Sequence, residues 1–186
     1  MTARASPELV NSARPSEARP VTALTVRACC VILHDGQVAL IHRQRPGGDQ
    51  YSLPGGLVHA DEEVPAALAR ELNEELGLDV TALPCRPELR WVQDQITTRP
   101  GSTAPFRRLH LIHVLPGLPP HARHAMSATE QDAEDYARIV WKRIGQAAHL
   151  HLYPAAGAAI ETLAGTCGQP APVLLPPITD QSFRWR

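Results

Sequence analysis

Apolar and polar residues alternate or cluster in short runs between residues 22 and 164, a pattern that predicts several strands and two helices. The run TVRACCVILHDGQVALIHRQ holds apolar stretches on either side of Asp35-Gly36, which is typical of a tight turn between paired strands. Further strands are predicted in LDVTAL, PELRWVQDQI, FRRLHLIHV and ARIVWKRI, loops in RPGGDQYSLPGG and residues 118–135, and a short helix in YPAAGAAIETLAG. Strands mixed with two helices predict an α/β or α+β sandwich, in which helices cover a mixed sheet.

The longer of the two helices is predicted within residues 61–77. Its apolar residues recur at steps of four and would form one buried stripe: Val64, Leu68, Leu72 and Leu76. Asp61 is a suitable N-cap, and Pro65 is tolerated in the first turn because its missing N–H has no helical partner there. Gly77 is typical of the residue that ends a helix. Local signals therefore define both ends of this helix.

The two ends of the chain differ from its middle. Residues 1–20 are rich in Ala, Arg, Pro, Ser and Glu without an apolar period, which predicts a disordered arm. Residues 21–164 are the predicted domain, since a chain of 186 residues is long enough for one well-buried core. Residues 165–186 are predicted to be a proline-rich tail, in which VLLPPI, Phe183 and Trp185 are candidates for docking onto the domain.

The charge balance limits the classes of partner. The chain has 18 Lys and Arg residues against 19 Asp and Glu residues, a formal net charge of -1, so it lacks the basic field typical of nucleic-acid binders. No apolar run is long enough for a signal-peptide core or a bilayer span, which predicts a cytoplasmic protein without a membrane partner. The four cysteines lack paired CxxC spacing and are predicted to be reduced and mostly buried: Cys29, Cys30, Cys85 and Cys167.

The predicted helix carries an unusual concentration of negative charge near its end. Glu71, Glu74 and Glu75 stand at i, i+3 and i+4, so their carboxylates share one edge of the helix. The helix dipole opposes acids in these last turns by roughly 0.3 to 1 kcal/mol each. Arg70 can pair with Glu74, but one cation cannot neutralise three acids. A hard divalent cation, Mg²⁺ or Mn²⁺, could do so, whereas the alternative is a solvated acidic face.

The spacing around these glutamates is specific. Gly56 is followed after five residues by Glu62, and seven residues later comes RELNEELGL, residues 70–78. This stretch resembles the Nudix box, GX5EX7REUXEEXGU, at every fixed position, and a chance match has a probability of roughly 10⁻⁷ at ordinary residue frequencies. YSLPGG, just before the box, is similar to the family's lead-in, and IVWKRI followed by HLHLYP is similar to its closing segment. The resemblance covers roughly residues 22–164.

The resemblance implies a fold, a chemistry and a set of site residues. The fold would be a Nudix-type α/β/α sandwich with a mixed sheet, and the activity would be hydrolysis of a phosphorus-containing acid anhydride by water attack at phosphorus. The cofactor would be Mg²⁺ or Mn²⁺, which would be held by Glu71, Glu74, Glu75 and the backbone carbonyl of Gly56. Arg70 would orient these glutamates. The catalytic set implied in this way is Glu71, Glu74, Glu75 and Arg70.

The remaining candidate residues concern the substrate, a small-molecule nucleotide. Arginine suits phosphate oxygens, and the arginines predicted to bind substrate are Arg27, Arg43 and Arg45, with Arg107 and Arg108 as further candidates. His59 stands where the family often has Glu and is a candidate for substrate contact or an exposed loop histidine. In this family an acidic residue from a distal loop often acts as the general base. The candidates for this role are Glu130, Asp132, Glu134 and Asp135. The alternative is that these acids only keep a loop soluble.

Three activities remain open. The leading hypothesis is a metal-dependent pyrophosphohydrolase that cleaves a nucleoside diphosphate linked to another moiety, such as a nucleotide-sugar, over which the loop after Pro116 could close. The second is a house-cleaning nucleoside triphosphate pyrophosphatase. The third is a non-catalytic nucleotide sensor, which the complete set of box glutamates disfavours. Whether the chain forms a homodimer is left open.

Overall fold

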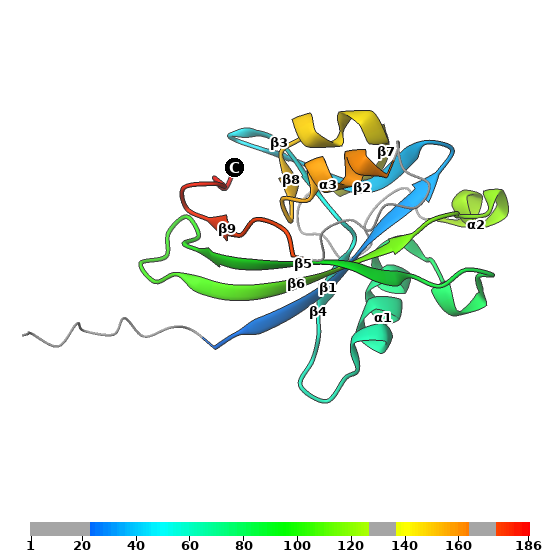
Figure 1. Ribbon diagram of the computed structural model, residues 1–186, viewed down its shortest axis with the longest axis horizontal. Helices are drawn as coiled ribbons and strands as arrows, with labels where there is room; N and C mark the ends of the chain where they lie inside the picture. Colours follow the sequence, from blue (N-terminus) through cyan, green and yellow to red (C-terminus); the bar gives the residue numbers. More distant parts are fainter. Residues whose placement is uncertain (1–22, 127–136, 164–173) are drawn as a thin grey trace, which may run out of the picture.

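The computed structural model describes residues 23–126, 137–163 and 174–186. Within these ranges the chain forms strands with helices on both sides (Figure 1). The elements in chain order are β1 (Thr25–His34), β2 (Gln37–Arg45), β3 (Gly48–Ser52), β4 (Gly55–Leu57), α1 (Val64–Leu76), the 3₁₀ helix η1 (Val80–Ala82), β5 (Glu88–Thr97), β6 (Phe106–Leu115), α2 (Pro120–Ala125), β7 (Ala137–Arg143), the 3₁₀ helix η2 (Ile144–His149), β8 (Leu152–Tyr153), α3 (Gly157–Thr162) and β9 (Ile178–Thr179).

The sheet is mixed, as predicted. The strand order across it is β8-β3-β2-β1-β6-β5-β9, with β4 paired to β1 and β7 paired to β2. Neighbours β1 and β6 run parallel, whereas β2–β3, β2–β7 and β5–β6 are antiparallel. The predicted hairpin at Asp35-Gly36 joins β1 to β2, and both turn residues have positive φ, 46° and 71°. The hairpin prediction is confirmed.

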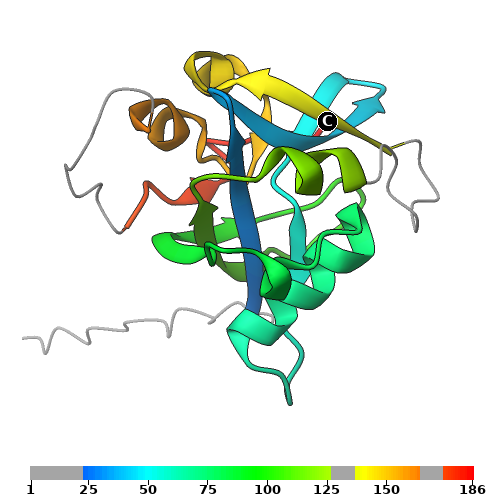
Figure 2. The same cartoon turned by 90° about the vertical axis from the view of Figure 1, so that its right-hand side faces the viewer.

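Alternate residues of β1 supply two separate cores. Cys29 and Val31 belong to the apolar core beneath η2 and α3, while Ala28, Cys30 and Ile32 belong to the core beneath α1. Successive side chains of a strand point to opposite faces, so a strand covered on both sides reads as a continuous apolar run. Figure 1 and the view turned by 90° in Figure 2 show α1 on one side of the sheet and α3 on the other. The predicted α+β sandwich is confirmed.

Helix α1 follows the predicted apolar stripe but not the predicted start. Leu68, Leu72 and Leu76 are fully buried, and Gly77 ends the helix at φ 65° with its N–H donated to the Asn73 carbonyl. The N-cap prediction was wrong. The cap is Glu63, whose carbonyl accepts the first helical bond from Ala67, while no side chain caps the helix.

Two loop and strand predictions were also wrong. The segment RPGGDQYSLPGG contains β3 and β4 rather than only a loop, because pairing with β2 and β1 satisfies its backbone. LDVTAL forms η1 instead of a strand, since the Asp79 carboxylate accepts hydrogen bonds from the N–H and the hydroxyl of Thr81 and tightens the turn. In the segment predicted to be a loop, residues 118–135, α2 covers the first part and residues 127–136 lie outside the described ranges.

Residues 174–186 pack onto the domain; we call this segment the C-terminal strap. Its strand β9 pairs in parallel with β5, and the Phe183 side chain is buried. In Figure 1 the strap, in red, runs beside β5 and ends near β3. VLLPPI and the two aromatic residues were candidates for docking, and the described part of the tail does dock. In the described part of the chain, no helix has the length and apolar character needed to cross a membrane.

Gly55 gives a direct test of how β4 packs. Its φ is 126°, and a Cβ added there would overlap the backbone of Ala28 and Cys29 on β1. We expect Gly55→Ala to lower the free energy of unfolding by about 3 kcal/mol or more, measured by urea denaturation. Gly36→Ala is the matched control, because Gly36 also has positive φ but has open space around it. It should lose only about 1 kcal/mol, and an equal loss in both variants would contradict the packing argument.

Candidate active site

Two glutamates of α1 reach the same short strand. The backbone N–H of Gly55 donates to Glu75 Oε2 at 2.7 Å. The Glu71 carboxylate lies so close to Gly56 that a Cβ on that glycine would overlap it. The two carboxylates are one helical turn apart, and each meets β4 where the strand begins. Glycine is therefore required sterically at both positions, against the β1 backbone at Gly55 and against the Glu71 carboxylate at Gly56.

Arg70 connects the acidic residues to one another. Its guanidinium forms a bidentate pair with Glu62, with Nε–Oε1 and Nη2–Oε2 distances of 2.9 Å. Its Nη1 donates to Glu71 at 2.8 Å and to Glu74 at 3.2 Å, and Nη2 also donates to the Leu57 carbonyl at 3.2 Å. The predicted Arg70–Glu74 pair is confirmed, and the fork geometry lets one cation position three carboxylates.

The same contacts shift the pKa values of Glu62 and Arg70 in opposite directions. Hydrogen bonds from Arg70 lower the pKa of Glu62 below its ordinary value of 4.5. Hydrogen bonds to Glu62 and then Glu71 raise the pKa of Arg70. Both groups therefore stay charged at neutral pH, and the pair holds its geometry through the range in which a hydrolase works.

A cavity of about 170 Å³ joins the acidic helix to a group of arginines. We call it the arginine cavity. Its lining comes from β1, β2, β3, α1, β6, β8, the strap and the segment after β5: Arg27, Arg43, Arg45, Gln50, Ser52, Glu75, Arg99, Arg108, Tyr153 and Trp185. The three arginines predicted to bind substrate thus lie together with one predicted metal ligand.

Neighbouring polar groups hold several of these arginines in place. Arg27 donates to the Leu53 carbonyl at 3.1 Å, and Arg43 donates to the Ser52 hydroxyl at 3.1 Å. Arg108 donates to the Tyr153 hydroxyl at 3.2 Å. Such contacts fix the guanidinium groups before a ligand arrives, which lowers the entropy cost of binding an anion.

Behind the cavity, β5 and β6 bury a row of polar side chains. Tyr153 donates its hydroxyl proton to Gln95 Oε1 at 2.8 Å, and His110 Nε2 lies 2.7 Å from the same oxygen. Burial, followed by the charges of Arg27 and Arg108, lowers the pKa of His110 to about 2. His110 is therefore a neutral donor through Nε2, and this network supports Tyr153 without adding a charge.

Other predicted site residues do not meet in this cavity. His59 does not line it; its side chain is 61% exposed, with Nδ1 3.8 Å from Glu62 Oε2. Arg107 pairs instead with Asp94 at 2.9 Å. The candidate distal bases lie outside the described residues: Glu130, Asp132, Glu134 and Asp135. Across residues 23–126, 137–163 and 174–186, no three acidic, histidine or cysteine side chains are already gathered as a metal site.

Several cavity residues were not identified from the sequence. Arg99 follows β5, Gln50 and Ser52 lie on a strand predicted to be a loop, and Trp185 lies in the strap. The sequence contained one signal, the alternation of Gln93, Gln95 and Thr97 along β5, and the structure buries all three side chains. Buried polar side chains need hydrogen-bond partners, and Gln95 bonds to Tyr153, which lines the cavity.

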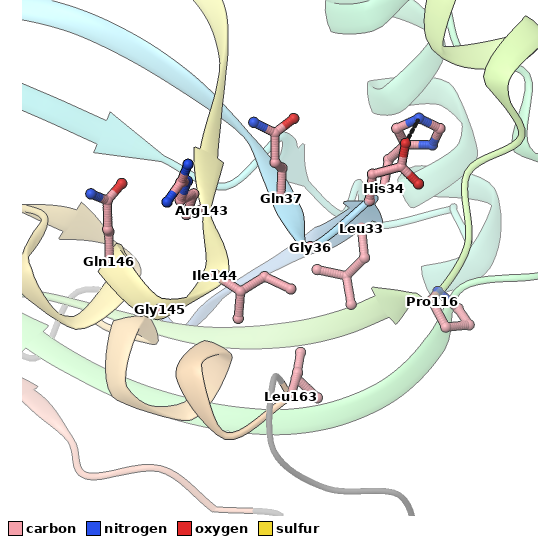
Figure 3. Close-up of a pocket in the computed structure, with 11 residues that line it drawn as sticks. Leu33, His34, Gly36, Gln37, Pro116, Arg143, Ile144, Gly145, Gln146 and Leu163 are labelled. Atoms are coloured by element: carbon pink, nitrogen blue, oxygen red, sulfur yellow. Dashed lines mark ion pairs between the residues drawn. The ribbon is translucent and has the colours of Figure 1, made fainter.

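A larger hollow, of about 970 Å³, lies at the β1–β2 turn (Figure 3). Its lining includes Leu33, Arg143, Ile144 and Leu163, and the ion pair His34–Asp35, 3.2 Å long, stands at its side. None of the α1 glutamates and none of the arginines of the arginine cavity line it. Of these two cavities, the smaller is the one that a glutamate of α1 lines.

The chain is similar to known proteins in both sequence and fold. The family model for the NUDIX domain matches residues 23–161. A curated protein of Mycobacterium tuberculosis named "Putative 8-oxo-dGTP diphosphatase 2" is 34% identical over 123 residues, which are 65% of this chain and 77% of that protein.

Solved structures share the fold. A MutT NUDIX hydrolase from Burkholderia pseudomallei has a TM-score of 0.53 at 24% identity, over 75% of this chain and 98% of that one. A bifunctional NMN adenylyltransferase/ADP ribose pyrophosphatase from Francisella tularensis has a TM-score of 0.54 at 23% identity, over 80% of this chain and 43% of that one. The Nudix-type fold prediction is confirmed. The chain belongs to the Nudix hydrolases, enzymes that act on phosphorus-containing acid anhydrides.

Proposed function

We propose that this Nudix hydrolase is a divalent-metal-dependent nucleotide pyrophosphohydrolase, with nucleoside triphosphates as its principal substrates. One observation carries the proposal: Glu75 lines the same cavity as Arg27, Arg43 and Arg45. Arginines placed beside a carboxylate suit a ligand that brings both phosphate oxygens and a metal ion. Two further arginines, Arg99 and Arg108, also line the cavity and extend its positive surface.

The residues present fit Mg²⁺ or Mn²⁺. Glutamate oxygens are hard donors, and the absence of a Cβ at Gly56 leaves room for the Glu71 carboxylate against the backbone of β4. Glu71, Glu74, Glu75 and the Gly56 carbonyl would hold the ion. When bound, the metal lowers the pKa of a water molecule and offsets phosphate charge. Because Arg70 already holds Glu71 and Glu74, small side-chain movements would accompany binding.

The chain's own residues would divide the work as follows. The arginines of the cavity bind the phosphate oxygens and orient the anhydride for in-line attack by water. Of the three box glutamates, Glu75 is the one that lines the cavity, so its carboxylate stands nearest the reacting phosphate. Arg70, which does not line the cavity, acts as a positioning residue that holds Glu71 and Glu74 beside each other.

Two observations favour triphosphates over nucleoside diphosphates linked to another moiety. The preference for nucleoside diphosphates linked to another moiety, the leading hypothesis from the sequence, depended on the loop after Pro116 closing over a sugar. The described part of that loop packs against α1, with Leu118 and Ala122 in one apolar core with Leu72 and Leu76. It does not line the arginine cavity. The M. tuberculosis relative is named for a triphosphate substrate, which supports the same choice. The diphosphate-linked class remains the second candidate.

A product screen tests the proposal. Purified protein with Mg²⁺ or Mn²⁺ would be incubated with dGTP, 8-oxo-dGTP, ATP, ADP-ribose and UDP-glucose, and nucleoside monophosphate, pyrophosphate and phosphate would be measured separately. We expect a nucleoside monophosphate and pyrophosphate from at least one triphosphate. Excess chelator should abolish turnover, added Mg²⁺ should restore it, and far-UV circular dichroism should stay unchanged throughout. Cleavage of ADP-ribose or UDP-glucose alone would select the diphosphate-linked class, and tight binding without turnover would select a sensor.

A further inference from the structure

The C-terminal strap spans the arginine cavity from one half of the sheet to the other. At one end, Leu175 N–H donates to the Val92 carbonyl and Thr98 N–H donates to Asp180, at 2.9 and 2.8 Å. At the other end, Arg186 Nη1 donates to the Asp49 carbonyl in β3 at 2.9 Å. The strap is therefore anchored on both sides of the cavity and forms one of its walls.

Trp185 is the strap residue that lines the cavity. Its ring centroid lies 5.1 Å from that of Tyr153 and 5.3 Å from that of Phe183, and the Arg99 guanidinium stands 5.7 Å from it. Phe183 is buried, so the strap has a firm base. An aromatic ring held in this way loses little freedom when a ligand stacks on it.

Apolar packing alone is a poor explanation for tryptophan at this position. The indole Nε1 of Trp185 is buried and has no hydrogen-bond partner among the described residues. An unsatisfied buried donor destabilises the fold, and phenylalanine would fill an apolar contact without that cost. A large aromatic ring beside a row of arginines suits a nucleotide, because any nucleobase can stack on an aromatic ring.

We infer that the strap is part of the substrate-binding site and that Trp185 recognises the nucleobase of the nucleotide whose phosphates the arginines bind. The inference depends on the proposed function and deepens it. The arginines contact the charged end of the substrate, and Trp185 contacts its aromatic end. Trp185 is thus a specificity-determining residue that separates nucleotides from other phosphoanhydrides.

Isothermal calorimetry with two probes tests this assignment. The probes are dGTP and inorganic tripolyphosphate, each titrated into the full chain with Ca²⁺ in place of Mg²⁺ to limit hydrolysis. Trp185→Ala should weaken dGTP binding about tenfold, and Trp185→Phe should weaken it less, about threefold, because a smaller ring still stacks. Tripolyphosphate should bind all three proteins equally. Trp141→Phe, at a tryptophan that does not line the cavity, should match the wild type.

The outcomes separate this inference from the proposed function. Equal dGTP binding by wild type and Trp185→Ala would overturn the inference and leave the proposed function standing. Equal weakening of both probes would also overturn it, because Trp185 would then act only through the shape of the cavity. A wild-type chain that binds tripolyphosphate as tightly as dGTP would show that the base adds nothing. Binding of neither probe would overturn the proposed function itself. If Trp185→Ala fails to fold, Trp185→Phe decides between these outcomes.

Discussion

Replacing Glu75 with Gln is expected to lower kcat/KM about 10³-fold while the fold stays intact. The substitution removes a negative charge from the arginine cavity but keeps the length and planarity of the side chain. The carbonyl oxygen of Gln can still accept the hydrogen bond from Gly55 N–H. The loss should therefore reflect charge at the reacting phosphate, for which general acid–base and metal-ion effects are of this size.

Glu63→Gln is the matched control for this experiment. It makes the same chemical change at an exposed residue just before α1, where the side chain forms no capping hydrogen bond. Its rate should stay within about twofold of wild type. Both variants should melt within about 3 °C of wild type, equivalent to less than about 1 kcal/mol. Wild-type turnover by Glu75→Gln would sink the assignment of Glu75 to the reaction.

The sequence predicted well those parts of the protein that depend on interactions between residues close together in the chain. Gly77 had to end α1, since its positive φ suits a residue without a side chain, and Leu68, Leu72 and Leu76 had to face the sheet at steps of four. The Nudix box is one continuous segment that runs from β4 through the following loop and α1 to Leu78. A spacing pattern can therefore identify its residues before any tertiary contact is known.

The parts that sequence missed depend on contacts between distant segments. YSLPGG reads as a loop because its glycines and proline weaken strand propensity, yet Cys30 N–H donates to the Pro54 carbonyl and fixes it beside β1. Arg99 and Trp185 are 86 positions apart and meet only because β9 pairs with β5. Asp61 failed as a cap since the chain turns into α1 two residues later, at Glu63. No local signal contains such information.

Gly56→Ala is expected to lower activity about 10²-fold with little loss of stability. The added methyl group would overlap the Glu71 carboxylate, and that side chain is flexible enough to move away. The backbone is not obstructed as it is at Gly55, where the overlap is with β1 itself. A displacement of about 1 Å at a catalytic group costs about this much in rate. Steady-state kinetics and thermal melts would measure both effects.

A double variant tests the steric explanation directly. Glu71→Asp shortens the side chain by one methylene and should be impaired alone, because its carboxylate no longer reaches β4. In Gly56→Ala/Glu71→Asp the shorter side chain leaves room for the methyl group, so the two losses should not multiply. Because Gly56→Ala retains the backbone carbonyl, its effect is specific to the space that Glu71 needs. Strictly multiplicative losses would mean that the two positions act independently, which would contradict a shared site at the start of β4.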